Sequence, residues 1–255
     1  MGYNPQPPLR LEVPRVNIML PTNGDLSHSD LERLRQFDTC TLSNAIERLN
    51  VRPRNEGFMS NAVTCRFPQL RPVIGYAVTA RMRSSVTPVN GKCYYSNSEF
   101  WNYLAGFEGP RILVILDSDE QPGVGALVGE ACARISRAFG CVGCVTNGAV
   151  RDLPGISSLD YQVFSGSVAV SHAYAHVVDW GERVEIGGMR IVNGDLLHGD
   201  QHGVQMVPRR GAGNLAALAE QVLQEDREIC ELTERKDFSA ALLSAKVAEG
   251  SKHRL

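Results

Sequence analysis

Residues 139–154, FGCVGCVTNGAVRDLP, join an apolar run that stops at Gly148 to an adjacent pair of charged residues, Arg151 and Asp152. The segment from Cys141 to Thr146 predicts a buried strand. Open α/β sheets bind their ligands beyond the carboxyl ends of the strands, which is where the charged pair falls. Arginine binds oxyanions through two parallel hydrogen bonds and aspartate is a hard oxygen ligand, so the pair suits a small 2-oxo acid held with a divalent metal. A surface ion pair or a helix cap is the alternative interpretation.

Further helices and strands are predicted on both sides of this run. Before it we expect helices at 27–37 and 41–49, a strand at 73–83, a helix at 96–104, a strand at 111–117 and a helix at 126–139. After it, short strands are predicted at 161–164, 168–172, 183–186, 189–192 and 204–207, and a long helix at 215–232. The order of strand, Gly-rich loop, helix and strand makes an α/β unit. We therefore expect an N-terminal arm (1–26), a single α/β domain (27–235) and a peripheral C-terminal helix or tail (236–255).

Composition excludes several classes of protein. The chain has 255 residues, of which 43% are apolar and 21% charged, enough for one large domain with a sizeable core. A net charge of −2 gives no electrostatic reason to expect nucleic acid or an anionic membrane surface as a partner. No apolar run approaches the ~20 residues of a membrane span, and the proline-rich N-terminus lacks the apolar core of a secretory signal. The cysteine count of 7 is odd and does not resemble a disulfide framework, so we expect a cytoplasmic protein.

A Gly-rich segment lies between the predicted strand at 111–117 and the predicted helix. It contains Gly123, Gly125 and Gly129, whose backbone amides are placed to bind an anion such as a carboxylate at the start of the helix. A nicotinamide-binding loop is one alternative, although residues 118–122 separate the strand from the first glycine and Thr146-Asn147 stand where that motif has its acidic residue. Glycines that merely shape a turn are the other alternative.

Cysteines and histidines offer further candidates for a metal or redox site. Cys141 and Cys144 have the spacing of such a site, but both fall inside a predicted strand, which favours buried thiols. The histidines form two pairs with a spacing of four: His172/His176 and His198/His202. That spacing would suit a metal on a helix, and neither segment looks helical. Hydrogen bonding or substrate contact, including contact across a subunit boundary, is the favoured interpretation of these histidines.

Several motifs together resemble one known family. They are Gly129-Glu130, the Arg151-Asp152 pair with Gly148 before it and Gly155 after it, Gly187-Gly188, and the segment from Gly194 to Val204 with Pro208. Over about residues 35–225 the chain is similar to the family of 4-hydroxy-4-methyl-2-oxoglutarate aldolases and regulators of ribonuclease activity A, the RraA-like family. Residues 123–155 carry the most specific part of the resemblance.

The resemblance implies a fold, an assembly and an activity. The fold is an α/β, swivelling β/β/α domain of the RraA-like type, and the assembly is a homotrimer or a hexamer with active sites at subunit interfaces. The activity is that of a divalent-metal-dependent class II aldolase. Such an enzyme cleaves a 4-hydroxy-2-oxo acid to pyruvate and commonly decarboxylates oxaloacetate.

The resemblance also implies roles for particular residues. Arg151 would bind the carboxylate and the 2-oxo group, and Asp152 would hold Mg²⁺ or Mn²⁺, partly through waters. The contacts to the pyruvoyl group would come from the loop and helix start: Gly129, Glu130, Ala131 and Cys132. Cleavage between C3 and C4 leaves a pyruvate enolate, whose charge a cation and a guanidinium stabilise without a Schiff-base lysine. A water at or near the metal is the candidate base for the 4-hydroxyl proton, with Glu130 assisting.

Some residues depart from the family pattern. Glu130 stands where aldolases of the family tend to have aspartate, which would alter the proton relay or the favoured substrate. Thr146-Asn147 replace an apolar residue and an aspartate, and Asn193 replaces a proline. The alternative function is a non-enzymatic regulator that binds a ribonuclease or another protein. Such binders tend to lose the acid after the arginine, so Asp152 favours an enzyme.

Overall fold

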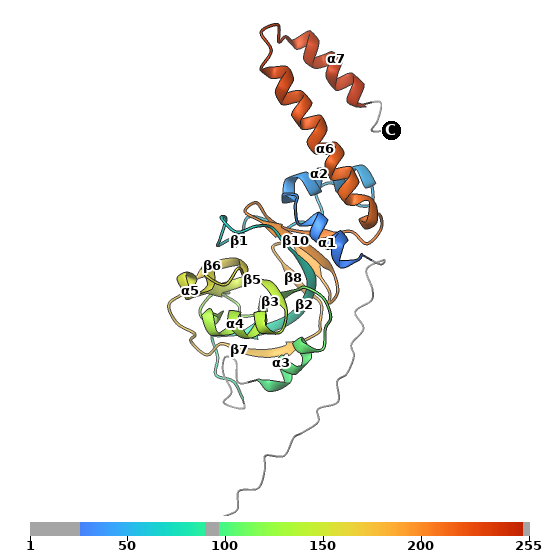
Figure 1. The fold of residues 1–255 in the computed structure, drawn as a ribbon. Helices are drawn as coiled ribbons and strands as arrows, with labels where there is room; N and C mark the ends of the chain where they lie inside the picture. The colour runs from blue at the N-terminus through green and yellow to red at the C-terminus, as the bar shows by residue number, and fades with distance from the viewer. Residues whose placement is uncertain (1–25, 90–96, 252–255) are drawn as a thin grey trace, which may run out of the picture.

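The fold is given by a computed structural model that describes residues 26–89 and 97–251 (Figure 1). Its helices are α1 (His28–Leu34), α2 (Thr39–Leu49), α3 (Ser98–Ala105), α4 (Glu130–Ala138), α5 (Leu153–Ser157), α6 (Ala212–Thr233) and α7 (Ala240–Ser251). Its strands are β1 (Thr64–Cys65), β2 (Val73–Arg83), β3 (Arg111–Asp117), β4 (Ala126–Val128), β5 (Cys141–Val150), β6 (Gln162–Val168), β7 (His176–Trp180), β8 (Val184–Ile186), β9 (Met189–Ile191), β10 (Leu196–Asp200) and β11 (Gly203–Val207). The predicted α/β class is confirmed.

One large curved sheet forms the centre of the molecule. Its main path runs β1-β6-β5-β3-β2-β10-β11, with β4 paired to β5 and β7 paired to β2. The pairs β2-β3, β3-β5, β5-β6 and β4-β5 are parallel, whereas β1-β6, β2-β10, β10-β11 and β2-β7 are antiparallel. β8 and β9 form a separate antiparallel hairpin. The parallel centre brings the carboxyl ends of β3 and β5 to the same edge of the sheet.

Burial on both faces explains the continuous apolar run of β3. Leu113 and Ile115 pack into a core cluster shared with α3, α4 and α5, whereas Ile112 and Val114 pack into a second cluster shared with the β8-β9 hairpin. Successive side chains of a strand point to opposite faces, so burial of both faces requires apolar residues at nearly every position. The sequence prediction of a strand buried on both faces is therefore confirmed.

A third apolar cluster joins α1, α2 and α6 to the β10 side of the sheet. Leu34, Leu42 and Leu215 pack there against Leu196 of β10. Beyond this cluster α6 continues away from the body, and α7 folds back beside it (Figure 1). Within the described ranges, none of the helices combines the length and the apolar character that a membrane crossing needs.

Two sequence expectations about secondary structure are wrong, and several short elements were not predicted. Residues 126–128 form β4, so the helix predicted at 126–139 spans only Glu130–Ala138; three apolar residues are too few for periodicity to separate strand from helix. No strand spans 168–172, because β6 ends at Val168 and the chain turns before β7 begins at His176. The sequence analysis missed β1, α5, β7 and β10; the His-Gly-Asp ending of β10 carries no strand signal.

The predicted N-terminal arm (1–26) lies outside the described residues except for Leu26. The segment predicted as a peripheral C-terminal helix contains α7. The division into arm, domain and tail remains a prediction.

Candidate active site

Pairing between β4 and β5 brings two separate segments together. Val128 pairs with Val150 in a parallel ladder, and the Arg151 amide donates to the Val128 carbonyl at 3.0 Å. β4 then gives way at once to α4, with Gly129 as its N-cap, while β5 gives way to Arg151 and Asp152. The start of α4 and the charged pair therefore lie side by side.

Two glycines permit the close approach of these segments. A Cβ on Gly129 would lie 2.5 Å from Asp152 Oδ2 and 3.1 Å from Arg151 Cγ. A Cβ on Gly155 would lie 2.5 Å from Glu130 Cδ and closer still to its Oε2. Any other residue at either position would force a carboxylate to move. The structure thus brings the predicted site residues Gly129, Glu130, Arg151 and Asp152 into one place, while their roles remain a proposal.

The contacts within the charged pair are loose. Arg151 Nε donates to Asp152 Oδ1 at 3.2 Å, and the Glu130 amide donates to Asp152 Oδ2 at 3.3 Å. The side chains of Arg151 and Asp152 keep 30% and 40% of their surface exposed. Long hydrogen bonds between partly exposed groups contribute little stability. Both groups are therefore available to a ligand at small cost.

Asp152 has a backbone conformation that few residues adopt readily. Its φ of 54° and ψ of 37° lie in the left-handed region, at the N-cap of α5. Apart from glycine, asparagine and aspartate are the residues most often found there. The bend turns the chain from β5 into α5 within one residue and keeps the Asp152 carboxylate against the start of α4.

The first turn of α4 adds backbone amides to the site. The Ala133 amide donates to the Gly129 carbonyl at 3.0 Å, and the amides of Ala131 and Cys132 precede this first helical hydrogen bond. Amides at a helix N-terminus attract anions. Ala131 is exposed, whereas the Cys132 side chain is buried in the core, where burial raises the pKa of its thiol to about 12. Cys132 can therefore meet a ligand only through its backbone.

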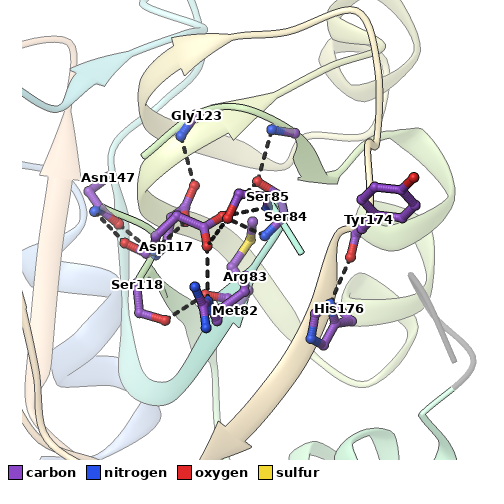
Figure 2. Close-up of polar contacts among 12 residues, drawn as sticks. Met82, Arg83, Ser84, Ser85, Asp117, Ser118, Gly123, Asn147, Tyr174 and His176 are labelled. Carbon is purple, nitrogen blue, oxygen red and sulfur yellow. Dashed lines mark hydrogen bonds and ion pairs between the residues drawn. The ribbon is translucent and has the colours of Figure 1, made fainter. Parts of the chain in front are cut away.

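A buried carboxylate network supports the loop between β3 and β4 (Figure 2). Asp117 ends β3, and its Oδ2 accepts a hydrogen bond from the Gly123 amide at 2.7 Å. Asp119 accepts from the amides of residues 84 and 85 at 2.7 and 2.8 Å and forms an ion pair with Arg83 at 3.0 Å. The network ties the end of β2 to the loop that leads through β4 to Gly129. In the sequence, the acid at the end of the apolar run of β3 was the only feature that pointed to this network.

The two carboxyl groups of this network have opposite pKa shifts. Burial raises the pKa of Asp117, and the amides of Gly123 and Asp119 offset that effect only in part. Burial also acts to raise the pKa of Asp119, but hydrogen bonds from residues 83–85 outweigh it, so the pKa lies well below its usual range. Both carboxyl groups are buried, and their hydrogen bonds to loop amides and to residues 83–85 support the loop.

The amides of the Gly-rich loop bind groups of the protein itself. The Gly123 amide donates to the Asp117 carboxylate, and the Gly125 amide donates to Ser84 Oγ at 3.0 Å. The loop leads into β4, whereas a dinucleotide-binding loop leads from its strand directly into a helix. This geometry argues against the nicotinamide alternative and moves the expected anion site from the loop to the start of α4.

Asn147 has a structural reason for its departure from the family pattern. Its Oδ1 accepts from the Asp117 amide at 2.7 Å, and its Nδ2 donates to the Asp117 carbonyl at 2.9 Å. This reciprocal pair joins β3 to β5 beside a shift in the register of β5 with β6. A carboxamide both accepts and donates, whereas a carboxylate can only accept. Asparagine therefore suits this position better than aspartate.

His172 and His176 flank a turn and bind backbone carbonyls. His172 Nδ1 lies 2.7 Å from the Ala126 carbonyl, and His176 Nδ1 lies 2.7 Å from the Tyr174 carbonyl (Figure 2). The sequence analysis expected no helix in this segment, and the structure has none there. Both residues make the hydrogen bonds that the sequence analysis favoured, and substrate contact stays a prediction.

His198 and His202 belong to β10 and its turn. His198 is fully buried, with Nδ1 3.4 Å from Thr39 Oγ1, and burial lowers its pKa to about 4, so the ring is neutral at pH 7. His202 Nδ1 lies 3.1 Å from Asp200 Oδ1, and Asp200 in turn accepts from the Thr39 amide at 2.8 Å. These contacts fasten β10 to the start of α2 and suit hydrogen-bonding roles.

The two cysteines with metal-like spacing are core residues. Cys141 and Cys144 are buried in β5, where burial raises the pKa of the Cys141 thiol to about 12 and that of Cys144 well above its usual value. Thiols with such pKa values are poor nucleophiles and metal ligands. The prediction of buried thiols is confirmed.

The carboxylates of Asp152 and Glu130 are suitable oxygen ligands for Mg²⁺ or Mn²⁺. Their side chains are 40% and 39% exposed. Among the residues that the structure describes, no group of three or more His, Cys, Asp or Glu side chains is arranged to hold a metal ion. Mg²⁺ is commonly bound by one or two carboxylates, with waters and substrate completing its shell. The donor set fits this open kind of site and does not fit a closed structural one.

Comparison with known proteins identifies the family. The family model described as RraA-like, Aldolase/RraA, matches residues 39–206. The chain belongs to this family, as its motifs predicted.

Individual relatives agree with this assignment. A protein of Halalkalibacterium halodurans, named "Putative 4-hydroxy-4-methyl-2-oxoglutarate aldolase", is 22% identical over 210 residues, which cover 79% of this chain and 88% of that protein. An uncharacterized protein from Pseudomonas syringae pv. tomato str. DC3000 has a similar structure, with a TM-score of 0.63 and 22% identity over 82% of this chain and 90% of that one. Streptomyces coelicolor RraAS2, described as an unusual member of the RNase ES inhibitor RraA protein family, has a TM-score of 0.61 and 19% identity over 79% and 96% of the two chains. The likeness confirms the RraA-type fold.

Proposed function

We propose that this protein is a divalent-metal-dependent carbon–carbon lyase, a class II aldolase that cleaves a 4-hydroxy-2-oxo acid such as 4-hydroxy-4-methyl-2-oxoglutarate to pyruvate and also decarboxylates oxaloacetate. The observation that carries the proposal is the contact of the Arg151–Asp152 pair with the start of α4. At that contact lie a guanidinium that can bind an oxyanion and backbone amides that can bind a carboxylate. Two carboxylates lie there as well, one to bind a cation and one to assist proton transfer. The aldolase name of the Halalkalibacterium halodurans relative supports the same chemistry.

In the proposed reaction the chain orients the substrate at its pyruvoyl end. Arg151 binds the C1 carboxylate and the 2-oxo group. The backbone of Gly129 and the amides of Ala131 and Cys132 contact the same carboxylate from the positive end of α4. The bond between C3 and C4 is thereby held next to Glu130.

Glu130 assists removal of the 4-hydroxyl proton through a water. As that proton leaves, the C3–C4 bond breaks, C4 becomes a carbonyl carbon, and the electron pair remains on C3 as the enolate of pyruvate. A proton delivered to C3 then completes pyruvate. Arg151 stabilises the negative charge on the 2-oxo oxygen as it develops, which is where an active site contributes most to the rate.

Asp152 would hold Mg²⁺ or Mn²⁺, partly through waters. When bound, the ion stabilises negative charge on the 2-oxo oxygen as a Lewis acid. A Schiff-base mechanism has no support, because the sequence contains no lysine between residues 123 and 152.

The proposal includes a homotrimer or hexamer with active sites at subunit interfaces. The supporting observation is exposure: the side chains of Arg151, Asp152 and Glu130 keep 30–40% of their surface. A lyase that forms an enolate benefits from a site closed to water, which a neighbouring subunit would provide. A cytoplasmic location suits the free cysteines of the described residues and a small 2-oxo acid substrate. Neither nucleic acid nor a membrane is part of the proposal.

Pyruvate release tests the proposal. Release from oxaloacetate and from 4-hydroxy-4-methyl-2-oxoglutarate is measured with Mg²⁺, with Mn²⁺ and with a chelator, for the wild type, Arg151→Ala and Asp152→Asn. Asparagine tolerates the left-handed backbone, so Asp152→Asn removes the charge and spares the turn. Asp160→Asn is the matched control, because Asp160 is exposed and also left-handed, with φ of 49°.

We expect metal-dependent release by the wild type and the control, and a fall of about 10²-fold or more in the two site variants. No release from either substrate by folded, metal-loaded wild type would refute the lyase proposal. The alternative of a non-enzymatic regulator that binds a ribonuclease or another protein would then stand, although the retained Asp152 argues against it.

A further inference from the structure

β5 contains an extra residue shortly before it reaches the candidate site. Thr146 pairs with Ser165 of β6. The next pair is Ala149 with Ser167, so residues 147 and 148 of β5 lie opposite one residue of β6. Such a β-bulge bends its strand and redirects the side chains that follow it. Arg151 follows Ala149 by two residues, so its direction depends on this bulge.

The bulge also lies where β5 changes its neighbour. Before it, β5 pairs with β3, and Ile115 with Thr146 is the last pair of that ladder. After it, β5 pairs with β4, beginning at Ala149 and Ala126. Pairing with β4 brings Arg151 to the start of α4, because the Arg151 amide donates to a β4 carbonyl. The way in which the chain crosses from one neighbour to the other therefore decides where the charged pair lies.

The side chain of Asn147 bonds the bulge to the end of β3. Its Oδ1 accepts from the Asp117 amide at 2.7 Å, and its Nδ2 donates to the Asp117 carbonyl at 2.9 Å. A carboxamide offers the same donor and acceptor as a backbone peptide group. The side chain thus binds β3 as one more residue of the β5 main chain would.

Close packing holds the bulge on both sides. A Cβ on Gly148 would lie 2.9 Å from Asp117 Cβ on β3. A Cβ on Gly166 of β6 would lie 3.0 Å from the Asn147 carbonyl carbon and closer still to its oxygen. Carbon atoms in contact are normally about 3.5–4.0 Å apart. The neighbouring strands therefore leave the bulge little room for another conformation.

Asp117 binds both segments that meet at the site. Its main chain bonds to Asn147 of β5, and its carboxylate accepts from the Gly123 amide, in the loop that leads to β4, at 2.7 Å. β5 continues to Arg151 and Asp152, and β4 continues to the start of α4. The bond between Asn147 and Asp117 thus fixes one segment relative to the other.

We infer that Asn147 is a positioning residue for the proposed reaction. By bonding to Asp117 across the bulge, it sets the place of Arg151 and Asp152 relative to the start of α4. The inference rests on the proposed function. Asn147 acts through the charged pair rather than by contact with the substrate.

Two measurements test this inference, and one of them needs no catalysis. The first is hydrogen exchange of the Arg151 amide, which donates to the Val128 carbonyl and so reports the contact between β4 and β5. The second is kcat for pyruvate release at saturating substrate and Mg²⁺, at a temperature well below the Tm of every variant. The variants are Asn147→Ala, which removes both hydrogen bonds, and Asn147→Asp, which keeps only the acceptor.

Asn193→Ala is the matched control. Asn193 lies between β9 and β10, and its Oδ1 accepts from the Thr79 amide of β2 at 2.7 Å. Asn147 and Asn193 are both half-buried and both bond the main chain of a central strand. Thermal melting of the control therefore separates a general loss of stability from an effect on the site.

We expect the Arg151 amide to exchange about tenfold or more faster in Asn147→Ala, as the loss of two hydrogen bonds would give. The kcat of this variant should fall on the order of 10²-fold, which is the cost of a misplacement of about 1 Å. Asn147→Asp should lie between the wild type and Asn147→Ala in both measurements, and it decides the matter alone if Asn147→Ala does not fold. Asn193→Ala should match the wild type in both measurements, whatever its Tm.

Unchanged exchange of the Arg151 amide in the Asn147 variants would overturn the inference. Faster exchange with the kcat of the wild type would overturn it as well, and so would equal effects in Asn193→Ala. A wild type that releases no pyruvate would refute the lyase proposal, whereas the exchange measurement would still show whether Asn147 places the charged pair. The two failures are therefore distinguishable.

Discussion

Replacing Gly155 with alanine should displace the Glu130 carboxylate and leave every charge in place. A Cβ at Gly155 would lie 2.5 Å from Glu130 Cδ and 3.0 Å from its Cγ, whereas carbon atoms in contact are about 3.5–4.0 Å apart. Glu130 is flexible and partly exposed, so its carboxylate would move by about 1 Å, a misplacement that costs on the order of 10²-fold in rate. We therefore expect aldol cleavage of 4-hydroxy-4-methyl-2-oxoglutarate to slow by about that factor. Decarboxylation of oxaloacetate should fall less, because that substrate has no 4-hydroxyl proton to remove.

The same substitution should not destabilise the fold. Gly155 lies in α5 and is not in the left-handed region, and alanine is preferred to glycine within helices by about 0.5–1 kcal/mol. Thermal melting should show a Tm equal to or slightly above that of the wild type. Gly213→Ala is the matched control, since Gly213 lies in the first turn of α6 and a Cβ there would meet no atom within 4 Å. It should retain both rate and Tm.

A Gly155→Ala variant with full aldol cleavage and an unchanged Tm would refute the assignment of Glu130 to the reaction. A double variant sharpens the test, because substitutions that act on one group are not additive. Glu130→Gln with Gly155→Ala should be no slower than Glu130→Gln alone. Additive losses would mean that the alanine acts elsewhere in the site.

Three further predictions concern stability and reactivity. Asp119→Asn should lower the free energy of unfolding at pH 7 by about 1–3 kcal/mol, because it removes the charge of a buried carboxylate that accepts the amides of residues 84 and 85 and pairs with the partly exposed Arg83. The pKa of Asp119 is lower in the folded protein than in the unfolded chain, so the wild type loses this contribution as pH falls below about 4. Urea melts of the wild type and the variant should therefore converge in acid. Equal stability of the two proteins at pH 7 would contradict the reasoning. The pKa of His198 is lowered to about 4 in the folded protein, so the unfolded chain takes up the proton first and the free energy of unfolding falls as pH drops from about 6.5 to 4. His198→Leu should flatten that part of the pH profile measured by urea melts. Parallel profiles for the wild type and the variant would contradict this reasoning. The buried Cys132 thiol, whose pKa is raised to about 12, should resist alkylation in the native protein at pH 8, while the exposed Cys40 reacts. Mass spectrometry follows the labelling of both residues. Early labelling of Cys132 would show that the prediction is wrong.

The elements that could be predicted from sequence are those whose own residues show a clear pattern of apolar or strand-forming side chains. β2 and β3 begin and end at the predicted residues, because β2 alternates and is rich in strand formers and β3 is an unbroken apolar run buried on both faces. β4 could not be predicted in the same way. Its three residues become a strand only by pairing with β5, an interaction that local composition does not encode.

Part of the candidate site could likewise be predicted from sequence, and part of it could not. The approach of Glu130 to Arg151 was expected, because a helix followed by a strand returns the chain to the edge it left. The support from Asp117 and Asp119 was not, since it depends on loop amides and on Arg83, far apart in the chain.

The left-handed backbone at Asp152 also restricts how this site can evolve. Aspartate, asparagine and glycine are the residues best suited to that conformation, and an aspartate codon becomes either of the other two by one nucleotide change. A lineage can therefore discard the proposed metal ligand in one mutation and keep the turn intact. On this reasoning, an enzyme of this fold lies a single substitution from a scaffold whose surface is free to be selected for binding other proteins.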